Sequence, residues 1–305
     1  MLKTKKIGVL MGGRSSEREV SLKSGKCISE ALKSLGYIVK EIIWGTDDDL
    51  AEIVGKANPD IVFNGLHGTY GEDGAVQGFL QCLGIPYTGS DIACSAMAMD
   101  KVISKAMFQM SGIPSAEWVL ASPGLKSSDL PFKLPCVVKP SLEGSSVGVT
   151  IVKEAGEFSK AISEAKNHKG VVMVEEFIEG REICTSVLGD RVLGSGEITP
   201  KNEFYDYEAK YNRDDTVYTF PPDIDSTLLE KLERVALEAH QTLGCRGYSR
   251  VDFRVRKEEV FVLEINTLPG MTNQSLFPKA AELSGHGFPE ICEKILEIGW
   301  QNAQK

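Results

Sequence analysis

Four polar residues near the carboxyl end of the chain have the types and spacing of a metal and phosphate site. Side chains two positions apart on a strand share a face, which puts Arg250 beside Asp252 on one predicted strand. Glu264 and Asn266 pair in the same way on the next strand. If residues 257–259 form the turn, Asp252 lies opposite Glu264. The same register puts Arg250 opposite Asn266. Carboxylate and amide oxygens suit magnesium. The alternative, a solvated face with an Arg–Asp pair, is less favoured because Asp and Asn are poor strand formers.

A lysine and a flexible loop form a second candidate, for phosphate binding. Lys139 ends a predicted apolar strand over residues 135–139, where its ammonium can meet a phosphate as a point charge. The Gly/Ser-rich stretch over residues 143–148 follows, and its backbone N–H groups can approach phosphate oxygens. An ordinary hairpin turn is the alternative, and the stretch does not match the P-loop pattern. Lys101, near the start of a predicted helix, is either a second phosphate ligand or a surface lysine.

Two loops in the first quarter of the chain are candidates for binding a small substrate. Residues 12–21 join a predicted strand to a helix, and such a junction aims N–H groups at an anion. Glu17 lies in this junction, where the alternative role is a capping carboxylate. His67 lies in the loop over residues 66–74, among three glycines and two acidic residues. The concentration of glycine and acidic residues around His67 favours a shaped binding loop over a lone structural histidine.

These candidate residues require a mixed α/β fold to bring them together. The first hundred residues have a βαβ rhythm, which predicts a parallel sheet with covering helices. Later segments pair as hairpins, one of them around Gly189 and Asp190. The predicted strands are 6–11, 37–43, 59–64, 116–121, 135–139, 148–152, 171–176, 182–189, 191–198, 247–256 and 260–266, and the predicted helices are 19–35, 100–111, 154–167 and 225–243.

The chain divides into three predicted units, at residues 1–93, 94–179 and 180–305. The last unit contains a polar stretch over residues 200–223 with weak periodicity and three tyrosines. A segment of that length inside a compact domain is functional or disordered, and the tyrosines argue against disorder. We therefore predict a lid at residues 200–223.

Composition excludes several classes of function. The net charge is −9 over 305 residues, so nucleic acid is not an expected partner. No apolar run is long enough to cross a membrane, and no signal peptide is predicted. The seven cysteines are scattered singly and lack a CxxC motif, which indicates buried free thiols in a reducing cytoplasm.

Taken together, the motifs resemble those of the D-alanine–D-alanine ligase family of the ATP-grasp superfamily. The resemblance covers nearly the whole chain in the right order, and it implies an ATP-grasp fold with an N-terminal, Rossmann-like parallel-sheet (preATP-grasp) domain. The matching segments are 12–21 (GGRSSEREVS), 67–74 (HGTYGEDG), 99–101 (MDK), 139–148 (KPSLEGSSVG), 205–211 (YDYEAKY), 247–252 (GYSRVD) and 264–275 (EINTLPGMTNQS).

The resemblance implies a nucleotide site for ATP. Lys101, Lys139 and Lys210 would contact its phosphates, and Glu182 would hold the ribose. Many relatives have Trp at the position of Phe177, and an aromatic ring is kept here. The residues implied to line the adenine are Glu175, Glu176, Phe177 and Ile178.

It also implies the metal ligands and the residues around the reacting groups. Two Mg2+ (or Mn2+) ions would be held by Asp252, Glu264 and Asn266. The first D-alanine would bind Glu17 and His67, and Ser145 and Tyr211 would link to Glu17 and close the active-site loop. Arg250 and the Gly270 backbone would stabilise the tetrahedral intermediate. The carboxylate of the second D-alanine would meet Ser275 and Leu276.

The expected reaction joins two D-alanines while ATP becomes ADP and phosphate, for peptidoglycan precursors, in a cytoplasmic homodimer. The nearest alternative is a D-alanine–D-lactate ligase, and the Tyr at position 211 resembles the dipeptide-forming type. A glutathione-synthetase-like ligase is disfavoured by the HGTYGEDG and YDYEAKY segments. A nucleotide-binding regulator without catalysis would be expected to lack a member of the Arg250, Asp252, Glu264 and Asn266 set.

Overall fold

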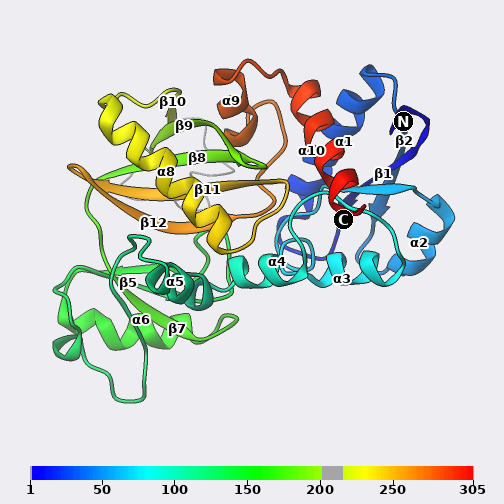
Figure 1. Cartoon of the computed structure of the whole chain (residues 1–305). Coiled ribbons are helices and arrows are strands. Elements are labelled where there is room, and N and C mark those ends of the chain that lie inside the picture. The colour runs from blue at the N-terminus through cyan, green and yellow to red at the C-terminus, as the bar shows by residue number, and fades with distance from the viewer. Residues whose placement is uncertain (1, 201–215, 305) are drawn as a thin grey trace.

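Three β-sheets organise the described part of the chain, residues 2–200 and 216–304 of the computed structural model (Figure 1). The first sheet is parallel and has the strand order β2-β1-β3, as the βαβ rhythm predicts. It lies on the right of Figure 1, away from the two antiparallel sheets on the left. Its strands are β1 (Lys6–Gly12), β2 (Ile38–Trp44) and β3 (Ile61–Asn64).

Helices cover both faces of the parallel sheet, which explains why β1 reads as an uninterrupted apolar run. Alternate residues of β1 face opposite ways: Val9 packs with α1 and α10, and Leu10 packs with α2 and α3. The last helix of the chain therefore completes the core around the first strand. The four helices are α1 (Arg18–Ser34), α2 (Leu50–Ala57), α3 (Ala75–Cys82) and α10 (Phe288–Asn302).

The second sheet is antiparallel, has the order β10-β9-β8-β11-β12, and carries the predicted metal residues. Helices α4, α5 and α8 share one apolar core with it, and α9 lies against β9 and β8. The strands are β8 (Arg181–Leu188), β9 (Arg191–Thr199), β10 (Val217–Thr219), β11 (Tyr248–Arg256) and β12 (Glu259–Asn266). The helices are α4 (Ile92–Met99), α5 (Lys101–Met110), α8 (Ser226–Thr242) and α9 (Leu276–Leu283).

The third sheet is antiparallel, with the order β4-β7-β5-β6, and α6 (Phe158–Ala165) packs on it. The Gly/Ser-rich stretch joins β5 to β6, so it is a hairpin connection as well as a candidate phosphate loop. Short 3-10 helices occur at Leu2–Thr4, Ser127–Asp129 and Ala155–Glu157. The strands are β4 (Trp118–Leu120), β5 (Cys136–Pro140), β6 (Thr150–Val152) and β7 (Val172–Glu176).

The β11–β12 hairpin confirms the predicted register at the site and corrects the predicted turn. Asp252 pairs with Glu264, as the sequence predicted. The turn, however, is two residues long, because the strands end at Arg256 and begin again at Glu259. A β-bulge supplies the missing residue: Phe253 pairs with Val262, which leaves Leu263 as the extra residue before Glu264. Bulges increase local twist and often lie next to active sites.

Two other expectations need comment. The seven cysteines are free, but Cys82 is exposed and Cys27 and Cys245 are half-buried, so the expectation of uniformly buried thiols is wrong. The division at residues 93/94 and 179/180 stays a prediction. The first boundary falls within α4, and apolar packing crosses the second because α4 and α5 share the core of the second sheet. Within the described residues, no helix is long and apolar enough to span a membrane.

Candidate active site

A cleft of about 1040 Å³ opens where the three sheets meet, and it gathers most of the predicted site residues. Its walls come from the α1 junction, the loop after β3, the β5–β6 loop and the β11–β12 hairpin. Lys210 and Tyr211 lie outside the described residues. The predicted residues that line the cleft are Glu17, His67, Lys101, Ser145, Arg250, Glu264, Asn266, Gly270, Ser275 and Leu276.

The hairpin face has the donor chemistry of a magnesium site. Arg250 donates two hydrogen bonds to Asp252, with Nε–Oδ1 and Nη2–Oδ2 distances of 2.7 Å. Asp252 is only 7% exposed, so this is not the solvated Arg–Asp pair of the alternative interpretation. Asn266 Oδ1 accepts the Leu268 N–H at 2.9 Å, which fixes the amide oxygen. Two carboxylates and one amide oxygen fit magnesium, which usually completes its ligand set with water and phosphate oxygens.

Within residues 2–200 and 216–304, no group of three or more His, Cys, Asp and Glu side chains could hold a metal by itself. Asp252 and Glu264 are two such side chains, and with the Asn266 amide they leave coordination positions for other ligands, such as phosphate oxygens. Lys101 Nζ lies 3.2 Å from Glu264 Oε2 and donates to the Glu143 carbonyl at 2.7 Å. Its side chain is 12% exposed, so Lys101 is not the surface lysine of the alternative interpretation.

Lys139 belongs to a buried triad that sequence reasoning found only in part. The Glu175 carboxylate, 2% exposed, lies between the ammonium groups of Lys139 and Lys105 and forms ion pairs with both. Burial alone would raise the pKa of Glu175, but the two lysine charges outweigh it and hold that pKa below its usual value. Burial, partly offset by the Glu175 charge, lowers the pKa of Lys105. Lys105 was missed, although it lies four residues after Lys101 on the same helix face.

The predicted nucleotide-edge residues lie where the chain crosses from the third sheet to the second, between the end of β7 and the start of β8. Glu176 Oε1 is 3.1 Å from Arg256 Nη1. Glu182 Oε2 is 2.9 Å from Arg254 Nη2. Ile178 is buried, and the Phe177 N–H donates to the Pro135 carbonyl. The Glu175 carboxylate faces Lys105 and Lys139. Only the backbone of Glu175 is therefore left to contact adenine.

The acceptor end is joined directly to the phosphate loop. Ser145 Oγ donates to Glu17 Oε1 at 2.6 Å across 128 positions of sequence. Ser145 and Ser146 have φ of 51° and 62°, a conformation that non-glycine residues rarely adopt. Such strain is typical of functional loops. Glu17 occupies the N-cap position of α1 without capping it through its side chain, so its carboxylate serves the cleft instead.

His67 is held at both ring nitrogens and is 6% exposed. Its Nε2 is 3.0 Å from Ser24 Oγ, and its Nδ1 is 3.5 Å from Glu72 Oε1. Ser24 Oγ also accepts the Met271 N–H at 3.3 Å, so this buried serine connects His67 to the turn after β12. Ser24 was missed, because a serine within a helix gives no distinctive sequence signal.

The turn after β12 presents backbone and hydroxyl groups to the cleft. Ser275 Oγ accepts the Thr272 N–H at 3.0 Å and lies at the N-cap of α9. A Cβ on Gly270 would lie 2.9 Å from that hydroxyl, so glycine suits this close approach. Ser275 is the N-cap of α9 and Leu276 is its first residue, and the backbone N–H groups at the start of a helix suit a carboxylate.

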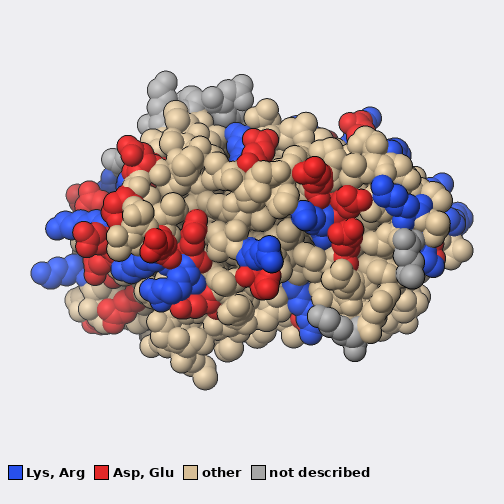
Figure 2. All heavy atoms as spheres, turned by 45° about the horizontal axis from the view of Figure 1, so that its top comes forward, with Lys and Arg blue, Asp and Glu red and all other residues tan. Residues whose placement is uncertain are grey.

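On the face in Figure 2, basic and acidic side chains are interspersed and do not form a continuous basic band. An excess of positive charge lies instead in the buried cluster of Lys105, Lys139 and Glu175, in which two ammonium groups share one carboxylate. That arrangement suits a small anionic substrate. Two antiparallel sheets beside a cleft that carries a hard-ligand face are the features of an ATP-grasp ligase.

Comparison with known proteins identifies the family. The family model for the D-ala D-ala ligase C-terminus matches residues 107–297, and that for the N-terminus matches residues 46–90. The chain is 49% identical to the D-alanine–D-alanine ligase of Geotalea uraniireducens (strain Rf4), covering 97% of this chain and 96% of that protein. It is 47% identical to that of Geobacter sulfurreducens, covering 97% and 94%.

Solved structures agree. The D-alanine–D-alanine ligase of Bacillus anthracis complexed with ATP superimposes with a TM-score of 0.85 at 32% identity, covering 98% of this chain and 99% of that one. The ligase of Coxiella burnetii gives 0.85 at 30% identity, covering 98% and 95%. The chain belongs to the D-alanine–D-alanine ligase family. These comparisons give no support to the D-lactate alternative.

Proposed function

We propose that this ligase joins two D-alanines through an acyl phosphate, in the cleft lined by Glu17, Lys101, Arg250 and Glu264. The observation that carries the proposal is the 2.6 Å hydrogen bond between Ser145 and Glu17. It holds the candidate phosphate loop against the candidate acceptor loop, which are the two groups of residues that an ATP-driven ligation must bring together.

The chemistry requires two successive charges to be stabilised. A carboxylate is a poor electrophile, so the first D-alanine is activated by transfer of the γ-phosphoryl group of ATP. Negative charge on that group meets Lys101 and Lys139. The amine of the second D-alanine then attacks the carbonyl, and charge develops on the carbonyl oxygen. Arg250 and Gly270 both line the cleft, and we assign the Arg250 guanidinium and the Gly270 backbone N–H to stabilise this charge. Phosphate then leaves.

The substrates are positioned by the two ends of the cleft. Glu17 and His67 orient the first D-alanine, and Ser275 with Leu276 receives the carboxylate of the second. The adenine takes the edge formed by Glu176, Phe177 and Ile178 with the Glu175 backbone, and Glu182 holds the ribose. Lys210 and Tyr211, outside the described residues, are proposed to complete the phosphate and lid contacts. Exclusion of water protects the acyl phosphate from hydrolysis.

Two magnesium ions, or manganese, are proposed as cofactors with ATP. Asp252, Glu264 and Asn266 would hold them, and the ions would supply charge neutralisation for the phosphates. The proposed context is a homodimer in the cytoplasm that makes peptidoglycan precursors from D-alanine and ATP. Membrane and nucleic-acid partners are not part of the proposal. The three units with boundaries at residues 93/94 and 179/180 remain the proposed domain division.

Phosphate release tests this function. Purified protein with Mg2+, ATP and D-alanine is expected to release phosphate and form D-alanyl-D-alanine, measured by a coupled phosphate assay and mass spectrometry. Reactions with D-lactate as second substrate are the matched comparison and should give little ester product. Equal phosphate release with and without D-alanine would contradict the ligase assignment. A predominance of ester would contradict the substrate assignment while leaving the ligase chemistry intact.

A further inference from the structure

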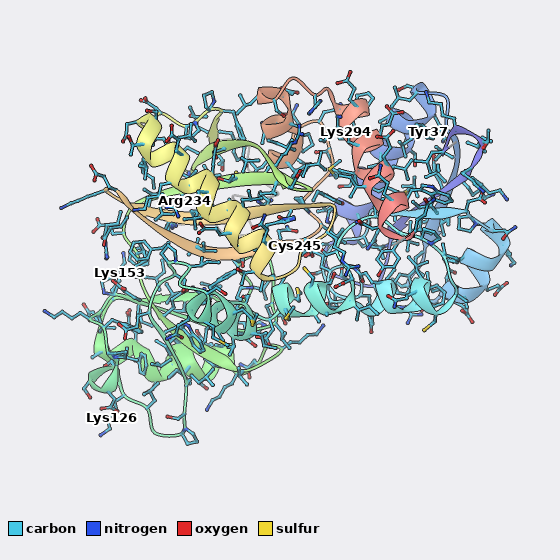
Figure 3. The ribbon with its side chains drawn as sticks, in the orientation of Figure 1. Tyr37, Lys126, Lys153, Arg234, Cys245 and Lys294 are labelled. Atoms are coloured by element: carbon cyan, nitrogen blue, oxygen red, sulfur yellow. The ribbon has the colours of Figure 1, made fainter. Side chains whose placement is uncertain are left out.

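A pair of thiols lies outside the cleft, where α4 meets the loop leading into β11. The Cys94 and Cys245 sulfur atoms are 3.3 Å apart, although 151 positions separate the two residues in the sequence. Cys94 is buried in the first turn of α4. Cys245 is half-buried and lies beyond the end of α8, where Figure 3 labels it. Neither residue lines the cleft.

Polar contacts around the thiols hold the two backbone segments together. Asp91 is the N-cap of α4, and its Oδ1 accepts the Cys94 N–H at 3.0 Å. Its other oxygen, Oδ2, is 3.1 Å from Arg246 Nη2. Ser90 Oγ accepts the Arg246 N–H at 3.1 Å. Asp91 and Ser90, which precede Cys94, therefore both contact Arg246, which follows Cys245. These contacts keep the two sulfur atoms close together.

The contact between the two thiols favours a thiolate at this pair. Hydrogen bonding with Cys245, opposed by burial, lowers the pKa of Cys94, and the N-terminal turn of a helix also favours a thiolate. The same hydrogen bond raises the pKa of Cys245. By contrast, burial raises the pKa of Cys136 to about 11 and that of Cys184 to about 12. Either sulfur atom of the pair can therefore serve as the nucleophile, with the other 3.3 Å away as its partner.

We propose that Cys94 and Cys245 are a redox modification site that forms a reversible disulfide on oxidation by a peroxide. A disulfide bond is about 2.05 Å long, so the sulfur atoms need to approach by a little over 1 Å. Metal binding is a poorer explanation. Two thiols alone do not make a closed zinc site, and in the described ranges no group of three suitable ligands occurs.

The oxidation balances in two steps. The thiolate of one cysteine attacks one peroxide oxygen and displaces hydroxide from hydrogen peroxide, which leaves a sulfenic acid on that cysteine. The thiol of the other cysteine then attacks the sulfenic sulfur and forms the S–S bond, and its proton leaves with the sulfenic hydroxyl as water. In total, two thiols lose two electrons to one peroxide and two waters form. A dithiol reductant reverses the reaction by exchange.

The bond would join two segments that lead to the active site. Helix α4 ends two residues before Lys101, and the Cys245 loop leads into the strand that carries Arg250. The bridge would close a loop that contains about half of the chain, because 151 positions separate the two cysteines. Cross-links that close long loops stabilise the folded state most, and we expect the melting temperature to rise by about 5 °C.

The test treats the full-length protein with hydrogen peroxide, blocks the remaining thiols, and maps the peptides by mass spectrometry without reduction. We expect a Cys94–Cys245 linked peptide two hydrogens lighter than its reduced parts, and a higher melting temperature that dithiothreitol reverses. Cys94→Ser, Cys94→Ala and Cys245→Ser should each lose both effects. Cys82→Ser removes an exposed thiol and should keep both.

Several outcomes would overturn the proposal. One is oxidation of Cys82 without a Cys94–Cys245 link. Another is conversion of either cysteine to sulfinic acid without formation of the link. A third is a linked peptide that forms only after the protein has been denatured. The reduced variants must melt within about 2 °C of the reduced wild type. If Cys94→Ser melts outside this range, the result for Cys94→Ala, which keeps an apolar side chain, is used to test for the disulfide. The readouts are independent of ligase activity.

Discussion

At the scale of single residues, the site contains a buried cluster in which two positive charges share one negative charge. The Glu175 carboxylate serves two lysines, one of which, Lys139, is proposed to meet phosphate. Lys105 is completely buried, and its ammonium forms an ion pair with this carboxylate. The cluster therefore has one positive charge in excess, which an incoming phosphate can use. Sequence reasoning found Lys139 because it ends a strand, but the role of Glu175 depends on a side-chain direction that no spacing reveals.

This imbalance predicts different costs for two substitutions. Lys105→Met leaves a neutral Glu175–Lys139 pair and should lower the free energy of unfolding by less than about 2 kcal/mol. Glu175→Gln leaves two like charges buried without a carboxylate and should lower it by about 3–5 kcal/mol. Urea unfolding at pH 7.5 measures both values. A larger loss for Lys105→Met would contradict the description of the cluster. Lys160→Met, on the exposed face of α6, is a control with little expected effect.

At the scale of elements, the sequence predicted the parallel sheet, both antiparallel hairpins and the long helix α8 with small errors at their ends. Helices α2, α3, α4 and α9 were missed, and each is eight residues long, too short for a clear period. Helix α10 was also missed, although Ile291, Ile295 and Leu296 follow a helical spacing. The bulge at Leu263 could not be predicted, because the alternation of β12 was compatible with either turn length.

The contact between α8 and β11 predicts a pH dependence of stability. His240 on α8 is buried with its Nδ1 2.7 Å from Ser249 Oγ, and burial lowers its pKa from 6.5 to about 4. The unfolded chain therefore takes up a proton before the folded chain does, so this stability is present above pH 6.5 and is lost as the pH falls toward 4. Between pH 7 and pH 5 the loss from this residue is about 2 kcal/mol.

His240→Gln removes the titrating imidazole, so the difference from the wild type gives the contribution of His240 to the pH dependence. Free energies of unfolding at pH 7 and pH 5 should differ by about 2 kcal/mol less in the variant than in the wild type. Half-buried His286, replaced by Gln, serves as the control and should leave the difference unchanged. Equal pH dependence in His240→Gln and the wild type would show that His240 is not held neutral in the folded protein.

At the scale of the whole molecule, the cleft exists only because three sheets meet. Sequence motifs identified its parts through resemblance, but their convergence comes from long-range packing. The Ser145–Glu17 hydrogen bond crosses from the third sheet to the helix that covers the first. A ligand that binds at this meeting point should stabilise all three parts at once.

Magnesium and ATP should therefore raise the melting temperature together. At a ligand concentration about 100 times the dissociation constant, the stabilisation is about 2.7 kcal/mol, or a rise of about 4 °C for a chain of this size. Glu264→Gln should reduce the rise with Mg·ATP and abolish turnover even at saturating magnesium. Glu258→Gln, in the hairpin turn away from the cleft, is the control. A normal rise and normal turnover in Glu264→Gln would contradict the metal assignment.

The packing of α10 on the first sheet has a consequence for how the protein is made. Val9 in the first strand shares its core with Ile291 and Ile295 in the last helix. Chains emerge from the ribosome amino end first, so this apolar face stays uncovered until almost all of the protein has been synthesised. A nascent or truncated chain that stops before Phe288 would carry that face into solution. Completion of this amino-terminal core therefore waits for the synthesis of α10, and until then the nascent chain exposes an apolar face that is prone to aggregation.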